Sequence, residues 1–372
     1  MKGTRQIGMS APDIGPREIE RVVQVLQSGI LSIGPVVEQF EGQVAAYAGA
    51  SHGVAVSSGT AGLHMCVIAA GVGQGDEVIT TPFSFVASAN CILYERAVPV
   101  FVDVDPRTGN IDPARIEERV TKRTKAILPV HVFGQPADMD PILDIARRRH
   151  LVVIEDACEA IGAEYKGRRV GALGDAGIFA FYPNKQMTTG EGGMIVTNRD
   201  EWSPVFASLR NQGREEMNGW LDHARLGYNY RMSELSAALG VVQMERIEEL
   251  LSNRERVAAR YNRRLAQVSG ITAPAVAGTT TRMSWFVYVV RLDPAVDRDR
   301  VIAGLNGAGI AARPYFPAIH LQPFYRQLGH EPGTYPVTEQ LSRQSLALPF
   351  HGRLSESDVD RVCERLQTLV HS

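Results

Sequence analysis

Short apolar runs recur along the first half of the chain, with stretches of helical spacing between them. The runs are rich in β-branched residues and predict buried strands. They read VAVSS at 54–58, VITT at 78–81, VPVFVDVD at 98–105, AILPVHVF at 126–133 and LVVIED at 151–156. Helical segments such as AGLHMCVIAA and MDPILDIARRR separate them. This alternation predicts an α/β fold in which helices cover both faces of a mostly parallel sheet.

The pattern changes after residue 170. AGIFAFY and GGMIVT follow each other with too few residues between them for a crossover helix, so we expect two neighbouring strands, at least one of which can run antiparallel. A long helical pattern then runs from Ser233, a candidate N-cap, to about Leu265.

The last third of the chain predicts a separate, smaller unit. The Pro-, Gly- and Thr-rich stretch 273–281 predicts a loop, and the unit that follows has a strand at 284–292 and a last helix from about Ser355. We therefore expect a large α/β domain at residues 1–250 and a small C-terminal α+β domain at 251–372. The N-terminal segment of the large domain can pack on the small domain.

Composition narrows the class of protein. The chain has 372 residues, 44% of them apolar, with a net charge of −2. That length supports a full core, and the charge gives no reason to expect nucleic acid or an anionic membrane as a partner. The start lacks the apolar region of a signal peptide, and no stretch is long enough to span a bilayer. The four cysteines lack metal-type spacing, so we expect a cytoplasmic protein with neither disulfides nor a metal.

Residues that can carry out chemistry lie where the predicted strands end. VAVSSGTAGLHM ends a strand on Ser57, Ser58, Gly59 and Thr60 just before a helix, an arrangement typical of an anion site, although Ser and Thr also serve as ordinary N-caps. No Walker motif and no GxGxxG after a strand is present.

Two further strands end on candidate groups. LVVIEDACEA ends on Glu155 and Asp156, where an acid can hold a metal or a ribose, pair with a protonated heterocycle, or cap the next helix. Metal ligands are poorly represented nearby. TPFSFVASAN places Phe83 and Phe85 after another strand, as core residues or as a ring stacked on a flat cofactor.

The segment FYPNKQMTTGEGG carries one lysine, Lys185, after a buried strand. A desolvated lysine is a nucleophile toward carbonyls. Because the carboxyl ends of parallel strands meet at one edge, the anion site, the acid, the ring and the lysine should lie together. Together they match what pyridoxal phosphate requires: a phosphate site, a partner for the ring nitrogen, a ring cover and an amine.

The motifs just quoted resemble, in this order, those of the sugar aminotransferases of the DegT/DnrJ/EryC1/StrS family. The resemblance continues after them through LGYNYRMSELSAALG, RPYFPAIHLQPFY and LALPFHG. The resemblance covers nearly the whole chain and implies the fold of fold-type I pyridoxal phosphate enzymes. It implies that Lys185 forms the internal aldimine, that Asp156 pairs with the pyridine nitrogen and that Phe85 stacks on the ring. It also implies that Ser58, Gly59 and Thr60 hold the phosphate.

The resemblance further implies a homodimer with shared active sites, in which Asn229 of GYNYRMSE reaches the phosphate bound by the other subunit. Two positions depart from the family pattern. Ala180 replaces a more usual serine and cannot give the phosphate a hydroxyl contact, so Ser57, Ser58 or a water would have to compensate. Glu159 stands where Gln or His often contacts the phenolic oxygen of the cofactor, so we expect it to be protonated, turned away or bonded to another donor.

The expected activity is amino transfer, with L-glutamate as donor, to a keto-sugar linked to a nucleotide. NK-x-x-TTGEGG resembles family members that aminate C4 of 4-keto-6-deoxy sugars, whereas members acting at C3 more often carry GK-x-L-x-x-x-GDGG. The alternatives are a keto-inositol aminotransferase and a non-catalytic ligand-binding or regulatory protein on the same scaffold. A dehydratase branch of the family carries histidine at the position of Lys185, which argues against that activity.

Further residues are candidates for contact with the substrate. We expect a sugar-nucleotide cleft lined by Trp220, His223, Arg313, Tyr315 and His320, although the aromatic residues among them can equally serve domain packing.

Overall fold

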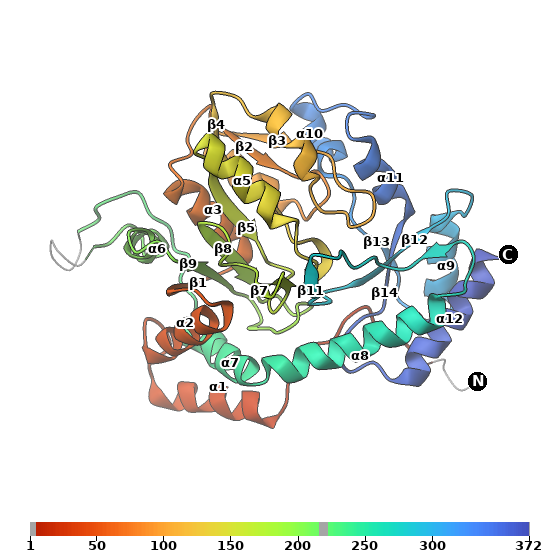
Figure 1. The fold of residues 1–372 in the computed structure, drawn as a ribbon. Helices are drawn as coiled ribbons and strands as arrows, with labels where there is room; N and C mark the ends of the chain where they lie inside the picture. The colour runs from red at the N-terminus through yellow and green to blue at the C-terminus, as the bar shows by residue number, and fades with distance from the viewer. Residues whose placement is uncertain (1–4, 216–221, 372) are drawn as a thin grey trace.

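A seven-stranded sheet forms the centre of the molecule (Figure 1). The computed structural model describes residues 5–215 and 222–371. The strands follow the spatial order β1 (His52–Val56), β9 (Gly193–Thr197), β8 (Ala176–Ala180), β5 (Val152–Asp156), β4 (Thr124–Ile127), β2 (Glu77–Thr80) and β3 (Val98–Phe101). The five apolar runs of the first half of the sequence each overlap one of these strands, namely β1, β2, β3, β4 and β5.

The sheet is parallel from β3 to β8, and β9 is antiparallel to both of its neighbours, β8 and β1. The expected pair of neighbouring strands is thus confirmed as β8 and β9. The loop 181–192 between them contains no helix, which forces the chain to reverse rather than cross over.

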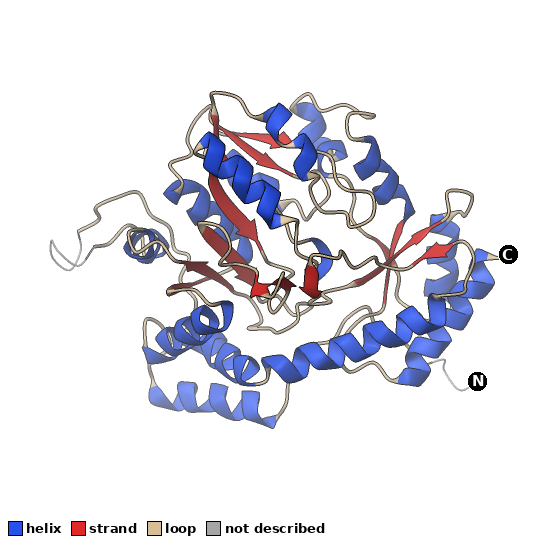
Figure 2. Cartoon of the chain, in the orientation of Figure 1, coloured by secondary structure: helices blue, strands red, loops and turns tan. Residues whose placement is uncertain are grey.

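Helices cover both faces of the sheet, as Figure 2 shows. One face packs against α2 (Pro35–Ala48), α5 (Met139–Arg149) and α7 (Glu234–Glu245), the other against α3 (Gly59–Ala69), α4 (Ala87–Tyr94) and α6 (Trp202–Arg210). Successive residues of β5 alternate between the two cores, with Val153 in the first and Ile154 in the second. The fold class expected from the sequence is confirmed, because the strands are apolar on both sides and the helices between them supply both covers.

The single helical pattern expected from Ser233 to Leu265 is two helices. α7 ends at Glu245, and α8 (Ile247–Leu265) begins after Arg246, whose φ of −108° and ψ of 8° break the regular turn. The Arg246 guanidinium bonds Glu18 of α1 (Pro16–Ser28) at 2.7 Å. α7 packs against α1 and α2, whereas α8 packs against α12 (Glu356–Val370), so the chain bends where its packing partners change. Ser233 is the N-cap of α7, as expected.

The C-terminal part forms a second, antiparallel sheet. Its strands follow the order β10 (Ile271–Thr272), β12 (Tyr288–Leu292), β14 (Ser345–Leu348) and β13 (Arg313–Pro314). The helices of this part are α9 (Arg298–Gly307), α10 (Pro323–Gln327), α11 (Pro336–Gln344) and α12. A three-stranded sheet joins the two parts of the chain, in the order β11 (Thr280–Arg282), β6 (Glu164–Tyr165) and β7 (Arg168–Arg169).

The core of the C-terminal sheet also takes residues from outside it. Ile7 lies in this core and pairs with Ile310 in a parallel bridge. Leu250 and Leu251 of α8 belong to the core of the central sheet, and Val257 of the same helix belongs to the C-terminal core. The expected domain boundary at residue 250 therefore falls within one continuous helix. Within residues 5–215 and 222–371, no helix is long and apolar enough to cross a membrane.

Candidate active site

Helix α3 begins at the carboxyl edge of the central sheet with unpaired backbone donors. Ser58 is its N-cap, and the Ser58 hydroxyl accepts a hydrogen bond of 3.1 Å from the Ala61 N–H. Within the described part of the chain, the N–H groups of Gly59 and Thr60 donate to no acceptor. Free N–H groups at a helix N-terminus attract anions, and the proton of the Ser58 hydroxyl can add a further donor.

Glycine is required where this helix meets the sheet. A Cβ atom at residue 59 would lie 2.8 Å from the Cβ of Ala180 and 2.8 Å from Sγ of Cys158. A Cβ atom at residue 193 would lie 2.7 Å from the Ser58 carbonyl. Both distances are too short for real atoms, so the two glycines let the start of α3 rest directly on β8 and β9.

The acids at the end of β5 point to opposite faces, as strand alternation requires. Glu155 is fully buried and accepts hydrogen bonds from His131 Nε2 at 3.0 Å and from three backbone N–H groups of the loop 171–174. The carboxylate oxygens of Glu155 are therefore already occupied by hydrogen-bond donors of the fold. Asp156 is 5% exposed and accepts from the Ser88 hydroxyl at 2.8 Å and from the Cys158 N–H at 3.1 Å.

Lys185 follows β8 and is mostly buried. Its side chain is 14% exposed, and Nζ lies 3.6 Å from Oε1 of Glu159 and 4.0 Å from the ring centroid of Phe286. The other lysines that the structure describes, Lys122, Lys125 and Lys166, are all exposed. Lys185 is thus the one described lysine held in a partly desolvated site, as a nucleophilic amine requires.

Glu159 contacts the lysine from the segment after β5. Its Oε2 accepts a hydrogen bond of 3.0 Å from the Phe133 N–H, while Oε1 faces the amine of Lys185. Burial raises the pKa of Glu159, and the nearby positive charge of Lys185 opposes that rise. The Glu159 carboxyl group is bonded to another donor, the Phe133 N–H, which is one of the three arrangements expected for it.

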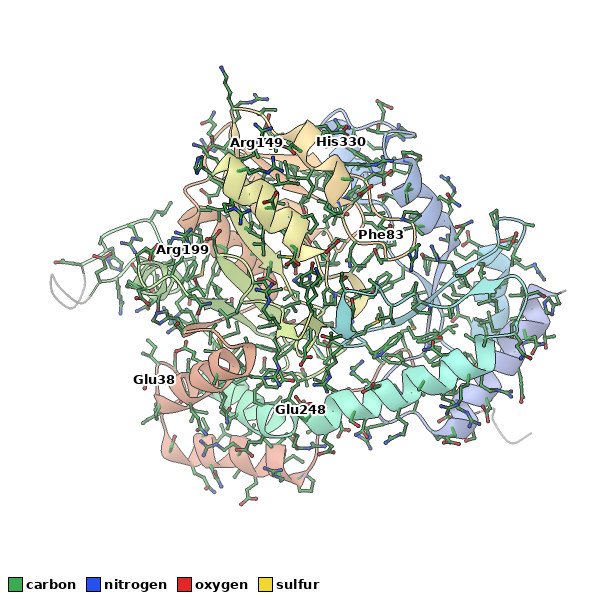
Figure 3. All side chains as sticks on the ribbon, viewed as in Figure 1. Glu38, Phe83, Arg149, Arg199, Glu248 and His330 are labelled. Atoms are coloured by element: carbon green, nitrogen blue, oxygen red, sulfur yellow. The ribbon has the colours of Figure 1, made fainter. Side chains whose placement is uncertain are left out.

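The two phenylalanines after β2 occupy different environments. Phe83, labelled in Figure 3, is buried and packs edge-on against Phe133 and Phe316. Phe85 is 63% exposed just before α4 and lines an open, mainly apolar cavity of about 840 Å³. Phe83 is therefore a core residue, and Phe85 is the ring free to stack on a flat ligand.

The residues expected to contact substrate differ in how far they are buried. Tyr315 is half-buried, packs against Phe133 and Phe316, and has a pKa that burial raises. Arg313 is exposed on β13. The side chain of His320 has 0% exposure and bonds Glu339 at 3.1 Å, so its ring lies in the interior rather than in a cleft.

The remaining expected residues lie on the segment that follows α6. Asn229 is exposed and bridges to Asn211, and the neighbouring Tyr230 carbonyl accepts a hydrogen bond of 2.7 Å from the Ser57 N–H. Asn229 is thus displayed at the surface close to the start of α3. His223 is also exposed, and Trp220 lies outside the described residues.

Two residues at this site were missed in the sequence. Ser88 bonds Asp156, and Arg254 of α8 donates a hydrogen bond of 2.6 Å to the carbonyl oxygen of Lys185. A single arginine on the apolar face of a helix, here one turn after Leu250 and Leu251, is the signal that could have identified Arg254.

These groups fit pyridoxal phosphate. Free N–H donors at a helix N-terminus suit its phosphate, a buried carboxylate suits its protonated ring nitrogen, and a partly buried amine suits its carbonyl. The described residues contain no group of three or more His, Cys, Asp or Glu side chains placed to hold a metal ion.

Comparison with known proteins identifies the class of enzyme. The profile of the DegT/DnrJ/EryC1/StrS aminotransferase family matches residues 12–367. The chain is 42% identical to the GDP-perosamine synthase of Caulobacter vibrioides, over the whole length of both chains. The PLP form of the putative sugar aminotransferase Spr1654 from Streptococcus pneumoniae superposes with a TM-score of 0.94 at 29% identity, over 99% of each chain.

A further solved structure, that of S. venezuelae DesV, superposes with a TM-score of 0.90 at 34% identity, over 95% of this chain and 94% of DesV. The matches confirm the fold-type I architecture and the resemblance drawn from the motifs. The chain therefore belongs to the DegT/DnrJ/EryC1/StrS aminotransferase family, and it is a sugar aminotransferase that uses pyridoxal phosphate.

Proposed function

We propose that this enzyme transfers the amino group of L-glutamate to C4 of a nucleotide-linked 4-keto-6-deoxy sugar. The observation that carries the proposal is the placement of Lys185, a mostly buried amine within NK-x-x-TTGEGG, 3.6 Å from the Glu159 carboxylate. That sequence resembles relatives that aminate C4. The relative at 42% identity is named for a GDP-linked amino sugar, which supports a nucleotide-linked substrate.

In this proposal the chain's own groups hold the cofactor in a fixed orientation. The N–H groups of Gly59 and Thr60, with the Ser58 hydroxyl, bind its phosphate at the N-terminus of α3. Asp156, held by Ser88 and by the Cys158 N–H, would keep the ring nitrogen protonated. Phe85 would cover one face of the ring. When bound, pyridoxal phosphate supplies an electron sink that stabilises negative charge at the reacting carbon.

Lys185 would supply the nucleophilic amine toward the cofactor carbonyl and the group that holds and moves the proton at the reacting carbon. Its amine rests against the Phe286 ring and beside Glu159. The Glu159 carboxylate lies within reach of the charged form of the amine.

We also propose that two copies of the chain share their active sites. Helix α1 leaves an apolar stripe exposed at helical spacing, formed by Ile19, Val23 and Leu26. The loop after it exposes Ile30, Leu31 and Ile33. Exposed apolar side chains of this kind favour burial against a second copy in a two-fold dimer. Asn229, exposed beside the start of α3, would then serve the partner's phosphate site.

A product assay tests the substrate class. The purified enzyme with pyridoxal phosphate and ¹⁵N-glutamate is offered nucleotide-linked 4-keto-6-deoxy sugars, 3-keto sugars and a keto-inositol, and products are identified by mass spectrometry. We expect ¹⁵N in the 4-amino sugar nucleotide. Turnover of the keto-inositol alone would move the assignment to that substrate, and labelling of the 3-keto sugars alone would overturn the choice of C4.

The shared site predicts that two inactive variants restore each other. Lys185→Ala removes the amine, and Asn229→Glu places a negative charge toward the phosphate. In a mixed dimer, one site carries both changes and the other carries neither, so part of the activity should return when the two variants are co-expressed. The measurement is the transfer rate of purified heterodimers carrying two different tags. If heterodimers form and remain inactive, Asn229 serves its own subunit or neither site.

A further inference from the structure

Arg254 is a buried cation whose hydrogen-bond partners, within the residues that the structure describes, are all backbone carbonyl oxygens. It is 4% exposed, and it forms no ion pair with any acid among the residues that the structure describes. Burial lowers its pKa to about 10, which leaves it charged at neutral pH. A buried charge is unfavourable unless it is well bonded, so the carbonyl groups around Arg254 must supply that compensation.

These carbonyl groups belong to the two segments that enclose the amine of Lys185. Nη2 donates to the Lys185 carbonyl at 2.6 Å and to the Asn184 carbonyl at 3.4 Å. Nη1 donates to the Phe286 carbonyl at 3.0 Å and to the Trp285 carbonyl at 3.4 Å. One planar guanidinium therefore fixes the backbone that carries Lys185 and the backbone that carries the ring beneath its amine.

The residue after the lysine is anchored independently. Gln186 Nε2 donates to the Glu159 carbonyl at 2.5 Å and to the Ser284 hydroxyl at 2.7 Å. Gln186 thus ties the lysine loop to the segment that carries Glu159, while Arg254 holds the upstream side. Loss of Arg254 would leave the carbonyls of residues 184 and 185 without this partner and free the loop on one side only.

Helix α8 gives Arg254 a rigid support. The helix runs along the lower edge of the molecule in Figure 1, and Glu248, labelled in Figure 3, marks its start. Arg254 lies between Leu251, which packs in the core of the central sheet, and Val257, which packs in the C-terminal core. The position of Lys185 is therefore tied to the helix that both cores share.

We propose that Arg254 is a positioning residue for Lys185, which it holds at the distance and angle that the cofactor carbonyl requires. The inference rests on the proposed role of Lys185 in the reaction. A residue that served packing alone could be apolar, whereas four carbonyl oxygens converging on one buried guanidinium require a charged, forked donor. Misplacement of a reacting group by about 1 Å can slow a reaction by about 100-fold.

The experiment measures how fast the apoenzyme captures pyridoxal phosphate. After timed mixing and borohydride reduction, mass spectrometry of peptides gives the amount of cofactor attached to Lys185. We expect Arg254→Ala to capture it roughly 10- to 100-fold more slowly than the wild type. Millimolar guanidinium, which can refill the space, should restore much of the rate, and urea should not. Arg256→Ala, an exposed change on the same helix, should behave as the wild type.

The outcomes separate this inference from the role of Lys185. If cofactor in the wild type attaches to a different lysine, the proposed role of Lys185 fails. If it attaches to Lys185 at the wild-type rate in a folded Arg254→Ala, the positioning role is overturned. If Arg254→Ala fails to fold, Arg254→Lys tests the proposal instead, since lysine keeps the positive charge but lacks the forked guanidinium. A rate below wild type in that variant supports the proposal, and an unchanged rate rejects it.

Discussion

Replacing Lys185 by alanine should abolish amino transfer and leave the chain folded. In the proposed mechanism, the variant loses both the amine that would bond the cofactor carbonyl and the group that would move the proton. Since a positioned proton-transfer group alone contributes about 10²- to 10⁴-fold, we expect the rate to fall by at least about 10³-fold. The backbone of the loop keeps its anchors at Arg254 and Gln186, so the fold should persist. The measurement is the transfer rate together with the melting temperature of the apoenzyme.

An exposed lysine supplies the matched control. Lys166 pairs with Asp140 at the surface, so Lys166→Ala should keep the wild-type rate. A small primary amine added to Lys185→Ala should restore part of the activity, because the truncated side chain leaves room beside Phe286. Wild-type rates in Lys185→Ala without added amine would show that another group carries the reaction.

The features that the sequence predicted are those set by local patterns. Apolar runs with helical stretches between them specify a parallel sheet, and the carboxyl ends of its strands meet at one edge. The residues predicted at that edge, Asp156, Lys185 and the start of α3, are close in space for this reason. Their roles in the reaction remain predictions, as does the assignment of Asn229 to a partner subunit.

The features that the sequence did not show depend on contacts between distant segments. Nothing local to Arg254 indicates that its guanidinium reaches carbonyls 69 and 32 residues away. The interior position of His320 depends on Glu339 in α11. The break at Arg246 was missed because the apolar spacing continues through it, although the helices on either side pack against different partners.

The environment also distinguishes residues that the sequence presents as pairs. Glu155 and Asp156 are adjacent acids, yet the first meets four donors within the fold and only the second remains available to a ligand. Phe83 and Phe85 differ in the same way, one buried and one exposed. Strand alternation predicts that Glu155 and Asp156 point to opposite faces of the sheet, but it does not apply to Phe83 and Phe85, which follow the end of β2. In both pairs, only the packed neighbours show which side chain is free.

Replacing Asp156 by asparagine should slow the chemical step and preserve the fold. The amide oxygen can accept the hydrogen bond from the Cys158 N–H, and the amide NH₂ group can donate a hydrogen bond to the Ser88 hydroxyl oxygen. Both local contacts can therefore survive. A neutral amide cannot hold the ring nitrogen of the cofactor protonated. Loss of a charge-assisted pair, about 1.5–3 kcal/mol, predicts a rate about ten- to a hundred-fold lower or more. Single-turnover kinetics with L-glutamate measure that step.

The neighbouring acid shows whether such an effect is chemical or structural. In Glu155→Gln, the fold loses a buried carboxylate that accepts from His131 and from the loop 171–174, so the melting temperature should fall. Asp156→Asn should instead keep a melting temperature close to that of the wild type and have a slow chemical step. Unchanged single-turnover kinetics in Asp156→Asn, with the cofactor still bound, would place Asp156 outside the reacting site. A fall in melting temperature as large as that of Glu155→Gln would make its effect structural.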